Sequence, residues 1–479
     1  MTTSEEEFSA MNQILKADSY KFSHAWQYPP GTTQVSAYIE ARAGGRFDEV
    51  TFFGLQMFLL EQLARPILRT DIDEAEALIR RHGLPFNRAG WEIILDDHAG
   101  MLPLEIEALP EGMTVPVGTP LVQVRNTDPR LPWLTTFIET ALLRAVWYPS
   151  TVATLSRQAK KLIHAALVQS SEDPDGQLPF KLHDFGARGC TSSEQAGIGG
   201  AAHLVNFMGT DTIEGLMYAR QYYGADMPGF SIPAAEHSTI TAWGPSAEVD
   251  AYRNMLTQFG GAGKLVAVVS DSYDVMNAVR NLWGAELKSE VIQMGGTLVV
   301  RPDSGDPTRE PVAILRALED AFGASRNAKG FLVLNRAVRV IQGDGMNISS
   351  LGALLRNVLD AGFSIDNIAF GMGGGLLQKV DRDTLRFALK ASQVVVGNET
   401  RDICKAPVTD LGKRSKAGRF TVVRERDGTI RTLRENDRTF LDAPLMQTVW
   451  RNGTMLKRWS FDEVRANAAL TSAPAQMAA

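Results

Sequence analysis

The stretch Leu265-Val-Ala-Val-Val-Ser-Asp-Ser-Tyr-Asp274 joins a short apolar run to a polar turn that follows it at once. The same order, an apolar run, a tight polar or glycine-rich turn and a helix-like segment, repeats from about residue 181 to residue 378. Such a repeat is typical of βα units, in which parallel strands alternate with helices. The apolar runs are 181–184, 204–207, 265–269, 297–300, 338–341 and 368–370.

Each apolar run leads directly into charged or glycine-rich residues. A barrel gathers the carboxyl ends of all its strands round one pocket, whereas an open sheet concentrates function at a switch point, so the sequence predicts a barrel. A glycine in any single turn can serve the turn alone, but recurrence after every run favours a shared site. The turns are Asp184-Phe-Gly-Ala-Arg188, Gly209-Thr-Asp211, Ser270-Asp-Ser-Tyr-Asp274, Arg301-Pro-Asp-Ser-Gly-Asp306, Gly343-Asp-Gly345 and Gly371-Met-Gly-Gly-Gly375.

The flanks of this repeat alternate like antiparallel strands, at 101–125 and, with an Asp-Gly turn, at 419–434. The predicted fold class is therefore α/β, an irregular (β/α) barrel with a second β-rich domain built from the N- and C-terminal segments. Helices are expected at 133–147 and 152–168, the second with a solvated face at 154–161. The expected divisions are 1–175, 176–385 and 386–479, with a disordered tail after about residue 470.

The composition excludes several classes of protein. A formal net charge of −6 and a pI near 5.8 lack the basic excess of a protein whose main partner is a nucleic acid. No run approaches the roughly 18 apolar residues of a membrane helix, and residues 1–13 do not resemble a secretory signal. Two cysteines, Cys190 and Cys404, are too few for a disulfide framework. We expect a cytoplasmic protein without nucleic-acid or membrane partners.

Cationic residues in and beside the turns point to a polyanionic ligand. Planar guanidinium groups hold phosphate oxygens two at a time, imidazole adds a titratable donor, and glycine N–H groups can serve a further phosphate. A lone arginine is more often a surface ion pair and a lone histidine a core residue, so the assignment depends on the whole set. The candidates are Arg188, Arg301, Arg382 and His237, with Gly343, Gly373 and Gly374.

Carboxylates occupy the same turns. Beside phosphates they usually indicate Mg²⁺ or ribose hydroxyls, and a carboxylate pair for acid–base catalysis is the rival interpretation. The sequence has no Walker A loop, dinucleotide fingerprint, Gly-x-Ser-x-Gly elbow or zinc-protease helix. The carboxylates are Asp271, Asp274, Asp303, Asp306 and Asp344.

Longer strings extend this pattern over nearly the whole chain. They are Ala17-Asp-Ser-Tyr-Lys21, Gln27-Tyr-Pro-Pro30, Asn126-Thr-Asp128, His183-Asp-Phe-Gly186, 191–199, His203-Leu-Val-Asn206, Gly209-Thr-Asp-Thr212, 233–243, 270–274, 301–305, Ile341-Gln-Gly-Asp-Gly345, 373–379, Lys413-Arg-Ser-Lys416 and Ser460-Phe-Asp-Glu463. Together they resemble the nicotinamide phosphoribosyltransferases, which are type II phosphoribosyltransferases. The longer strings are highly specific to that family.

The resemblance implies a role for each candidate residue. His237, Arg301, Asp303 and Arg188 would be the catalytic residues, and the two arginines and the histidine would bind pyrophosphate. The ribose and phosphate of the mononucleotide would contact Asp303, Gly343, Asp344, Gly373, Gly374 and Arg382, while Arg42, Lys390 and Lys405 would lie near the 5′-phosphate.

The resemblance also implies a pyridine site. Phe185 would stack on one face of the ring and Tyr20 of a second copy on the other, which implies a homodimer with shared sites. Asp211 would accept a hydrogen bond from the carboxamide, and its rival role is to cap the helix that follows. The chain departs from the family pattern at Ala187, where an aromatic residue is usual, and at Met372 and Ala388, where serines are usual.

The implied reaction joins nicotinamide to phosphoribosyl pyrophosphate, giving nicotinamide mononucleotide and pyrophosphate in NAD biosynthesis. The resemblance implies Mg²⁺ bound through the pyrophosphate, with no direct protein ligand other than the candidate Asp271, and stimulation by ATP through phosphorylation of His237. Two other readings stay open: a nicotinate or quinolinate phosphoribosyltransferase, whose site must bind a carboxylate, and a noncatalytic dimeric signalling protein.

Overall fold

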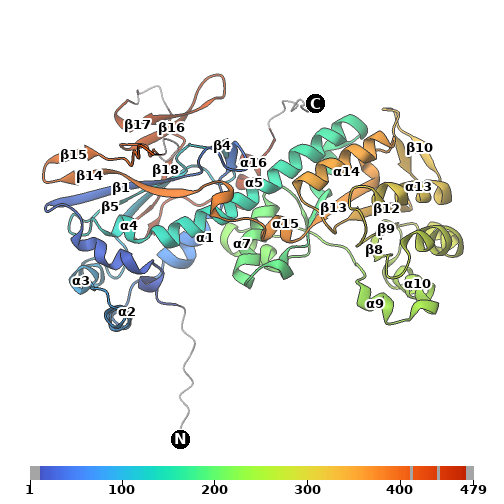
Figure 1. Cartoon of the computed structure of the whole chain (residues 1–479), viewed down its shortest axis with the longest axis horizontal. Helices are drawn as coiled ribbons and strands as arrows, with labels where there is room; N and C mark the ends of the chain where they lie inside the picture. Colours follow the sequence, from blue (N-terminus) through green and yellow to red (C-terminus); the bar gives the residue numbers. More distant parts are fainter. Residues whose placement is uncertain (1–10, 410–413, 438, 440–442, 471–479) are drawn as a thin grey trace, which may run out of the picture. The chain divides into compact units, whose positions relative to one another are not determined.

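The computed structural model describes residues 11–409, 414–437, 439 and 443–470. Contacts divide the chain into unit 1, Met1–Thr151 with Asp381–Ala468, and unit 2, Val152–Val380 with Ala469–Ala479 (Figure 1). The disordered tail expected after about residue 470 lies outside the described residues. Within the described ranges, no helix is both long and apolar enough to cross a bilayer.

Unit 1 is built on a seven-stranded antiparallel sheet in the order β15-β14-β1-β5-β3-β18-β19. Because β1 from the N-terminal segment pairs with β14 from the C-terminal segment, the predicted β-rich domain made from both flanks is confirmed. A separate hairpin turns at Gly428, whose φ of +89° favours glycine. The strands are β1 (Thr32–Glu40), β3 (Leu104–Ala108), β5 (Val122–Asn126), β14 (Ala388–Val396), β15 (Glu399–Asp402), β18 (Gln447–Arg451) and β19 (Thr454–Met455), with the hairpin β16 (Phe420–Arg424) and β17 (Ile430–Arg434) and the pair β2 (Glu49–Thr51) and β4 (Thr114–Pro116).

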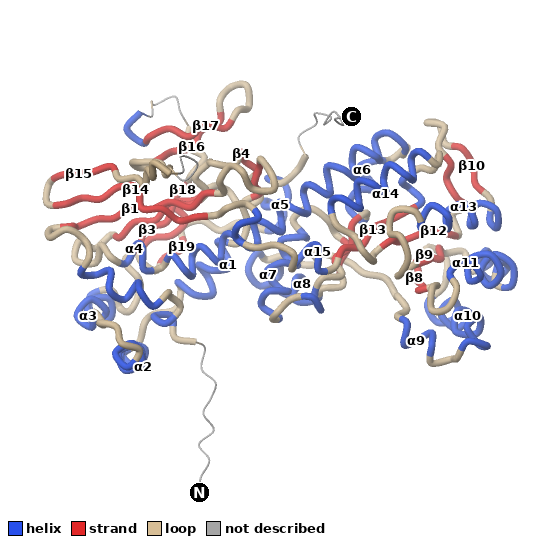
Figure 2. The backbone as a smooth tube through the Cα atoms, viewed as in Figure 1, coloured by secondary structure: helices blue, strands red, loops and turns tan. Residues whose placement is uncertain are grey.

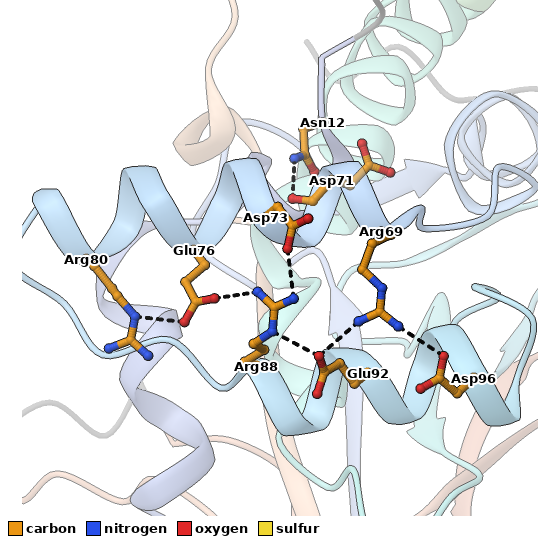
Figure 3. Close-up of polar contacts among 9 residues, drawn as sticks. All are labelled: Asn12, Arg69, Asp71, Asp73, Glu76, Arg80, Arg88, Glu92 and Asp96. Carbon is orange, nitrogen blue, oxygen red and sulfur yellow. Dashed lines mark hydrogen bonds and ion pairs between the residues drawn. The ribbon is translucent and has the colours of Figure 1, made fainter.

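Two surface helices of unit 1, α2 (Arg69–Arg81) and α3 (Arg88–Asp97), are joined by a network of ion pairs. The guanidinium of Arg88 on α3 donates to Asp73 on α2 and to Glu92 on its own helix (Figure 3). A single exposed pair contributes little, but here one cation serves several carboxylates and fixes α2 against α3.

One helix, α5 (Glu139–Ser170), carries the chain from unit 1 into unit 2. The sequence predicts two helices at 133–147 and 152–168, whereas the structure has α4 (Leu134–Phe137) and then a continuous α5 with Pro149 inside it. The predicted solvated face at 154–161 is wrong, because Thr154 and Ser156 are fully buried. The hydroxyl of Ser156 lies 3.0 Å from His203 Nδ1 of the neighbouring helix α7, so these polar residues serve packing inside unit 2.

Unit 2 contains a six-stranded parallel sheet in the order β7-β6-β13-β12-β9-β8, a half-barrel with helices around it (Figure 2). Five of the six predicted strands are confirmed, and the α/β fold class with them. The predicted strand at 204–207 is wrong, because Leu204 ends a helix, residues 205–207 form the turn after it, and the strand begins at Gly209. The strands are β6 (Leu182–Asp184), β7 (Gly209–Thr210), β8 (Leu265–Val269), β9 (Thr297–Arg301), β12 (Val338–Gln342) and β13 (Ile368–Met372), and the main helices are α7 (Ser193–Leu204), α8 (Ile213–Tyr223), α10 (Glu248–Phe259), α13 (Glu310–Phe322) and α14 (Ile348–Asp360).

A single segment, residues 230–235, pairs with both edges of this sheet. At one end Phe230 forms a parallel bridge with Gly209 of β7, and at the other Ala234 does so with Ala267 of β8. Backbone hydrogen bonds fix both ends, among them Thr210 N to Phe230 O at 3.0 Å and Ala267 N to Pro233 O at 2.9 Å. The segment, which we call the strap, therefore spans from one edge strand to the other.

The interior of the half-barrel is a small apolar cluster of Ala267, Val299 and Ile341, against which Phe185 and Ile232 pack. The Phe185 ring lies directly over two glycines: Gly343, which follows β12, and Gly371, which lies in β13. A Cβ built on Gly371 would overlap the Phe185 ring, and one built on Gly343 would lie 3.0 Å from it. These glycines leave the space that the aromatic ring occupies.

Lys181 is buried at the start of β6. Its Nζ donates to the carbonyl oxygens of Ile365 at 2.8 Å and Ile368 at 3.0 Å. A neutral amine has two N–H donors, which matches these two acceptors. Burial lowers the pKa of Lys181 to about 7, against an opposing contribution from Asp366.

We predict that Gly371→Ala lowers the thermal unfolding midpoint by several degrees, because the new methyl group displaces the Phe185 ring. Adding Phe185→Ala should restore much of that loss, since it removes the clashing ring. Gly352→Ala is the control, because its Cβ would meet only the tip of Arg356 at 3.7 Å. If Gly371→Ala lowers the unfolding midpoint by the same amount in the wild-type and the Phe185→Ala backgrounds, the clash with the Phe185 ring is contradicted.

We predict that Lys181 makes the free energy of unfolding depend on pH. Its folded pKa lies below its usual value of 10.5, so unfolding takes up a proton between these two values. Stability from the neutral amine is complete above the unfolded pKa and is lost as pH falls towards 7, at up to about 1.4 kcal/mol per pH unit. Urea unfolding between pH 6 and 9 should show a flatter pH dependence for Lys181→Met than for wild type, and no such change for the exposed Lys264→Met. The same slope in all three proteins would contradict the buried neutral amine.

Candidate active site

One end of the candidate site is built around Asp211, which directly follows β7. Its Oδ1 accepts hydrogen bonds from His183 Nε2 at 2.9 Å and from Ser231 Oγ at 2.5 Å. Burial raises the pKa of Asp211, but the hydrogen bonds from His183 and Ser231 and the charge of Arg301 outweigh it and hold that pKa below its usual value. No described residue donates to Oδ2, so an ionised oxygen is available to a ligand donor.

Asp211 does not cap the helix that follows it. The residue at the N-cap of α8 is Thr212, and the carboxylate of Asp211 bonds to His183 and Ser231 instead. The capping alternative is therefore wrong for this carboxylate.

Phe185 stands beside this carboxylate at the end of β6. Its backbone N–H donates to Met372 O at 3.0 Å, which fixes it to the end of β13. The centre of its ring lies 5.0 Å from that of His183, tilted by 45°. The ring is only partly buried, so an aromatic face is available near Asp211.

The other end of the site is built around Asp271, in the turn after β8. Its Oδ1 lies 3.0 Å from Nε2 of His237, the first residue of α9 (His237–Thr241). Its Oδ2 accepts from the backbone N–H of Asp303 at 3.1 Å and from the hydroxyl of Ser304. Burial raises the pKa of Asp271, but the bonds from Ser304 and His237 outweigh it and lower that pKa, so an ionised carboxylate orients the imidazole.

Arg301 and Arg188 provide positive charge at this end. Arg301 ends β9, and its guanidinium lies 3.8 Å from Asp303, whose other neighbour at 3.8 Å is His237 Nδ1. The buried Nε of Arg301 has no hydrogen-bond partner among the described residues. Arg188, in the turn Ala187–Gly189, is exposed, and no described carboxylate pairs with it. Arg188 and the unbonded Nε of Arg301 therefore have N–H groups with which an anion can bond.

Glycine turns follow the neighbouring strands β12 and β13. Gly343 and Asp344 come after β12, while Gly373 and Gly374 begin the short helix α15 (Gly374–Leu377). Within the described part of the chain, the N–H groups of these three glycines donate to no backbone or side-chain acceptor outside regular helices and strands. The side chain of Asp344 is exposed.

Five candidates lie in unit 1 and the rest lie in unit 2. Burial lowers the pKa of Lys390 in β14; Glu139 opposes this, and the charges of Arg42, Lys405 and Arg382 lower it further. Arg42, Lys405 and Arg382 therefore lie close enough to Lys390 for their charges to act on it. Tyr20, the fifth candidate of unit 1, lies in the 3₁₀-helix Ser19–Trp26 and is 56% exposed.

The three departures from the family pattern lie in different settings. Met372 is fully buried, so its side chain does not face a solvent-filled phosphate site. Ala388, at 3% exposure, begins β14 opposite Glu40. Ala187 is partly exposed between Phe185 and Arg188, so it is the one departure beside the site of unit 2.

Three contributors were not assigned from the sequence: His183, Ser231 and Ser304. Ser304 lies in the turn after β9 and His183 lies in β6, two residues before Phe185, and these positions beside strand ends are a signal that could have found them. Ser231 lies in the strap, where no strand or motif precedes it, so only the fold reveals its contact with Asp211.

The described residues do not form a metal site of their own. No group of three or more His, Cys, Asp or Glu among them could hold a metal ion. Asp271, the candidate ligand, already uses both carboxylate oxygens for hydrogen bonds.

Comparisons with known proteins identify the family and fold of the chain. The chain matches the model of the nicotinate phosphoribosyltransferase (NAPRTase) family over residues 180–453 and that of the nicotinamide phosphoribosyltransferase N-terminal domain over residues 12–106. In fold it is similar to nicotinate-nucleotide pyrophosphorylase from Pyrococcus furiosus, with a TM-score of 0.62 at 17% identity over 97% of both chains. It is also similar in fold to human nicotinic acid phosphoribosyltransferase, with a TM-score of 0.53 at 17% identity over 94% of this chain and 92% of the other.

Two curated relatives extend the match along the whole chain. A nicotinamide phosphoribosyltransferase of Xanthomonas campestris pv. campestris is 53% identical over 461 residues, which cover 95% of this chain and 98% of that relative. Another, from Acinetobacter baylyi, is 31% identical and covers 95% of this chain and 96% of its own length. The chain therefore belongs to the nicotinamide phosphoribosyltransferase family.

Proposed function

We propose that this protein transfers a phosphoribosyl group from phosphoribosyl pyrophosphate to nicotinamide, giving nicotinamide mononucleotide and pyrophosphate. The observation that carries the proposal is the ionised carboxylate of Asp211, held by two donors and with Oδ2 open, beside the ring of Phe185. A carboxamide N–H₂ can donate to that oxygen, whereas a carboxylate substrate would meet a like charge.

The proposed reaction forms a bond between the pyridine nitrogen and C1 of the ribose as the bond between C1 and the pyrophosphate oxygen breaks. The nitrogen carries no proton, so no general base is needed. Phe185 and Asp211 hold the base in line, and Arg301, Arg188 and His237 neutralise the charge that grows on the departing pyrophosphate. The charge of Arg301 also acts on Asp211, so the two ends of the site belong to one electrostatic field.

Mg²⁺ and ATP are part of the proposal. Mg²⁺ would arrive on the phosphates of the substrate and reduce their negative charge. ATP would transfer its γ-phosphoryl group to His237, with ADP leaving. Because Asp271 lies at Nε2 of His237, the nitrogen left to act as nucleophile is Nδ1.

We also propose a cytoplasmic homodimer. The low cysteine content, 2 residues in 479, supports the cytoplasmic compartment, because secreted proteins more often use several cysteines in disulfides. The exposed ring of Tyr20 supports the homodimer, since an aromatic side chain that is 56% exposed is available to a second copy of the chain.

A pyrophosphate-release assay separates this proposal from the alternatives. With phosphoribosyl pyrophosphate present, nicotinamide should support release far better than nicotinate or quinolinate. A noncatalytic signalling protein would release none with any of the three bases.

We predict that Asp211→Asn removes the preference for nicotinamide. Nicotinate would lose a hydrogen bond and meet a like charge, each worth about 1 to 3 kcal/mol, so the wild type should prefer nicotinamide by roughly thirtyfold or more in kcat/KM. Asparagine keeps an acceptor for His183 and Ser231 but no longer repels a carboxylate, so the ratio should fall towards one.

Ser231→Ala is the matched control for that variant. It removes one donor to Asp211 and leaves the charge in place, so the preference for nicotinamide should persist. A wild-type ratio in a normally stable Asp211→Asn protein would show that this carboxylate does not select the base.

We predict that two inactive variants complement each other. If Tyr20 of one copy completes the site of another, mixing Tyr20→Ala and Arg188→Ala chains should restore partial activity, because some hybrid dimers contain one undamaged site. The measurement is turnover after subunit exchange, with exchange verified by differently tagged chains. Exchange without recovered turnover would refute the shared site.

A further inference from the structure

Behind the carboxylate of Asp271 lies a buried set of hydrogen bonds that the proposed mechanism leaves unused. Ser270, the residue before Asp271, is fully buried. Its Oγ accepts from Trp283 Nε1 at 3.1 Å and donates to Val268 O at 2.9 Å. Its backbone N–H donates to the carbonyl of Arg301 at 3.0 Å. Ser270 therefore links the turn that carries Asp271 to two strands of the site.

Trp283 lies in an unusual element, the π-helix η7 (Ala278–Glu286). Such helices are rare and occur frequently at functional sites. The indole is fully buried and stacks on Tyr252 of α10, with ring centres 4.4 Å apart and planes 11° apart. The hydroxyl of Tyr252 in turn donates to Glu248 at 2.8 Å. Stacking thus fixes the plane of the indole, and with it the direction of the N–H group.

We propose that Trp283 is a positioning residue, whose indole N–H fixes Ser270 and through it the carboxylate of Asp271 that orients His237. The inference rests on the proposed function only where it predicts a change in kcat/KM. A carboxylate can orient an imidazole only if the backbone that carries the carboxylate is itself fixed. Ser270 is the residue that fixes the backbone at Asp271.

A purely structural role for Trp283 makes a different prediction. If the indole only fills the core, its replacement lowers stability and leaves the ring of His237 unchanged. If it positions Asp271, the electronic surroundings of His237 change even in a fully folded protein. The groups that face His237 are Asp271 at 3.0 Å and Asp303 at 3.8 Å. Asp271 lies in the turn after β8, and Asp303 lies in the turn after the neighbouring strand β9.

The test is Trp283→Phe, which keeps an aromatic ring over Tyr252 and removes the N–H donor. The first readout is the ¹⁵N spectrum of histidine-labelled full-length protein without substrates. The chain has 7 histidines, and the signal of His237 is the one that disappears in His237→Gln. We expect the His237 ring nitrogens of Trp283→Phe to move from the wild-type position towards that of Asp271→Asn. The second readout is kcat/KM for phosphoribosyl pyrophosphate, which should fall roughly tenfold while KM for nicotinamide stays near the wild-type value.

Trp91→Phe is the matched control, since Trp91 is an equally buried tryptophan of unit 1. It should lower stability and leave the His237 signal in place. Ser270→Ala should reproduce Trp283→Phe, and it carries the same test if Trp283→Phe does not fold. Because both act through one hydroxyl, the double variant should match Ser270→Ala alone.

A His237 signal that stays at the wild-type position in folded Trp283→Phe, while Asp271→Asn moves it, would overturn the proposal. Additive displacements in the double variant would overturn the route through Ser270. A wild-type protein that releases no pyrophosphate would instead refute the proposed function, and the spectrum would still decide the role of Trp283.

Discussion

The parallel hydrogen-bond ladder of unit 2 is the constraint on which the candidate site depends. Parallel pairing points every strand of β7-β6-β13-β12-β9-β8 the same way, so their carboxyl ends and the turns after them lie along one edge. Phe185, Asp211, Asp271 and Gly343 each follow a different strand of this sheet, and Arg301 ends a fifth. The residues are far apart in sequence, and the ladder alone brings them together.

Within that arrangement, the carboxylates act mainly by orienting other groups. Asp271 uses both oxygens to hold His237, Ser304 and the backbone at Asp303. Asp211 uses one oxygen for His183 and Ser231 and leaves the other open. Since the bonds that each receives keep it ionised, both remain acceptors at neutral pH. Arg301, 3.8 Å from Asp303, and the exposed Arg188 carry the positive charge of the site.

The sequence predicted those parts of the fold in which local pattern and tertiary role agree. The runs at 265–269 and 297–300 are buried on both faces, so they read as continuous apolar strands and form β8 and β9. The run at 204–207 is also buried, but it forms the last residue of helix α7 and the turn after it. A short buried run has no period that separates helix from strand. The small polar residues of α5 read as a surface and are buried, because they bond inside unit 2. Site residues in strand-end turns could be found in the same way, whereas Ser231 could not, because its contact depends on a segment that pairs with both sheet edges.

The strap at 230–235 is anchored to β7 at one end and β8 at the other, and the two anchors set the number of residues between them. Ser231 near the first anchor bonds Asp211, and His237, just beyond the second, meets Asp271. Surface loops usually tolerate insertions because their ends are the only fixed points. Here an added residue would pull one of these two contacts out of register. The two contacts together therefore fix the length of the segment, and the spacing from Ser231 to His237 is set by the width of the sheet that the strap crosses.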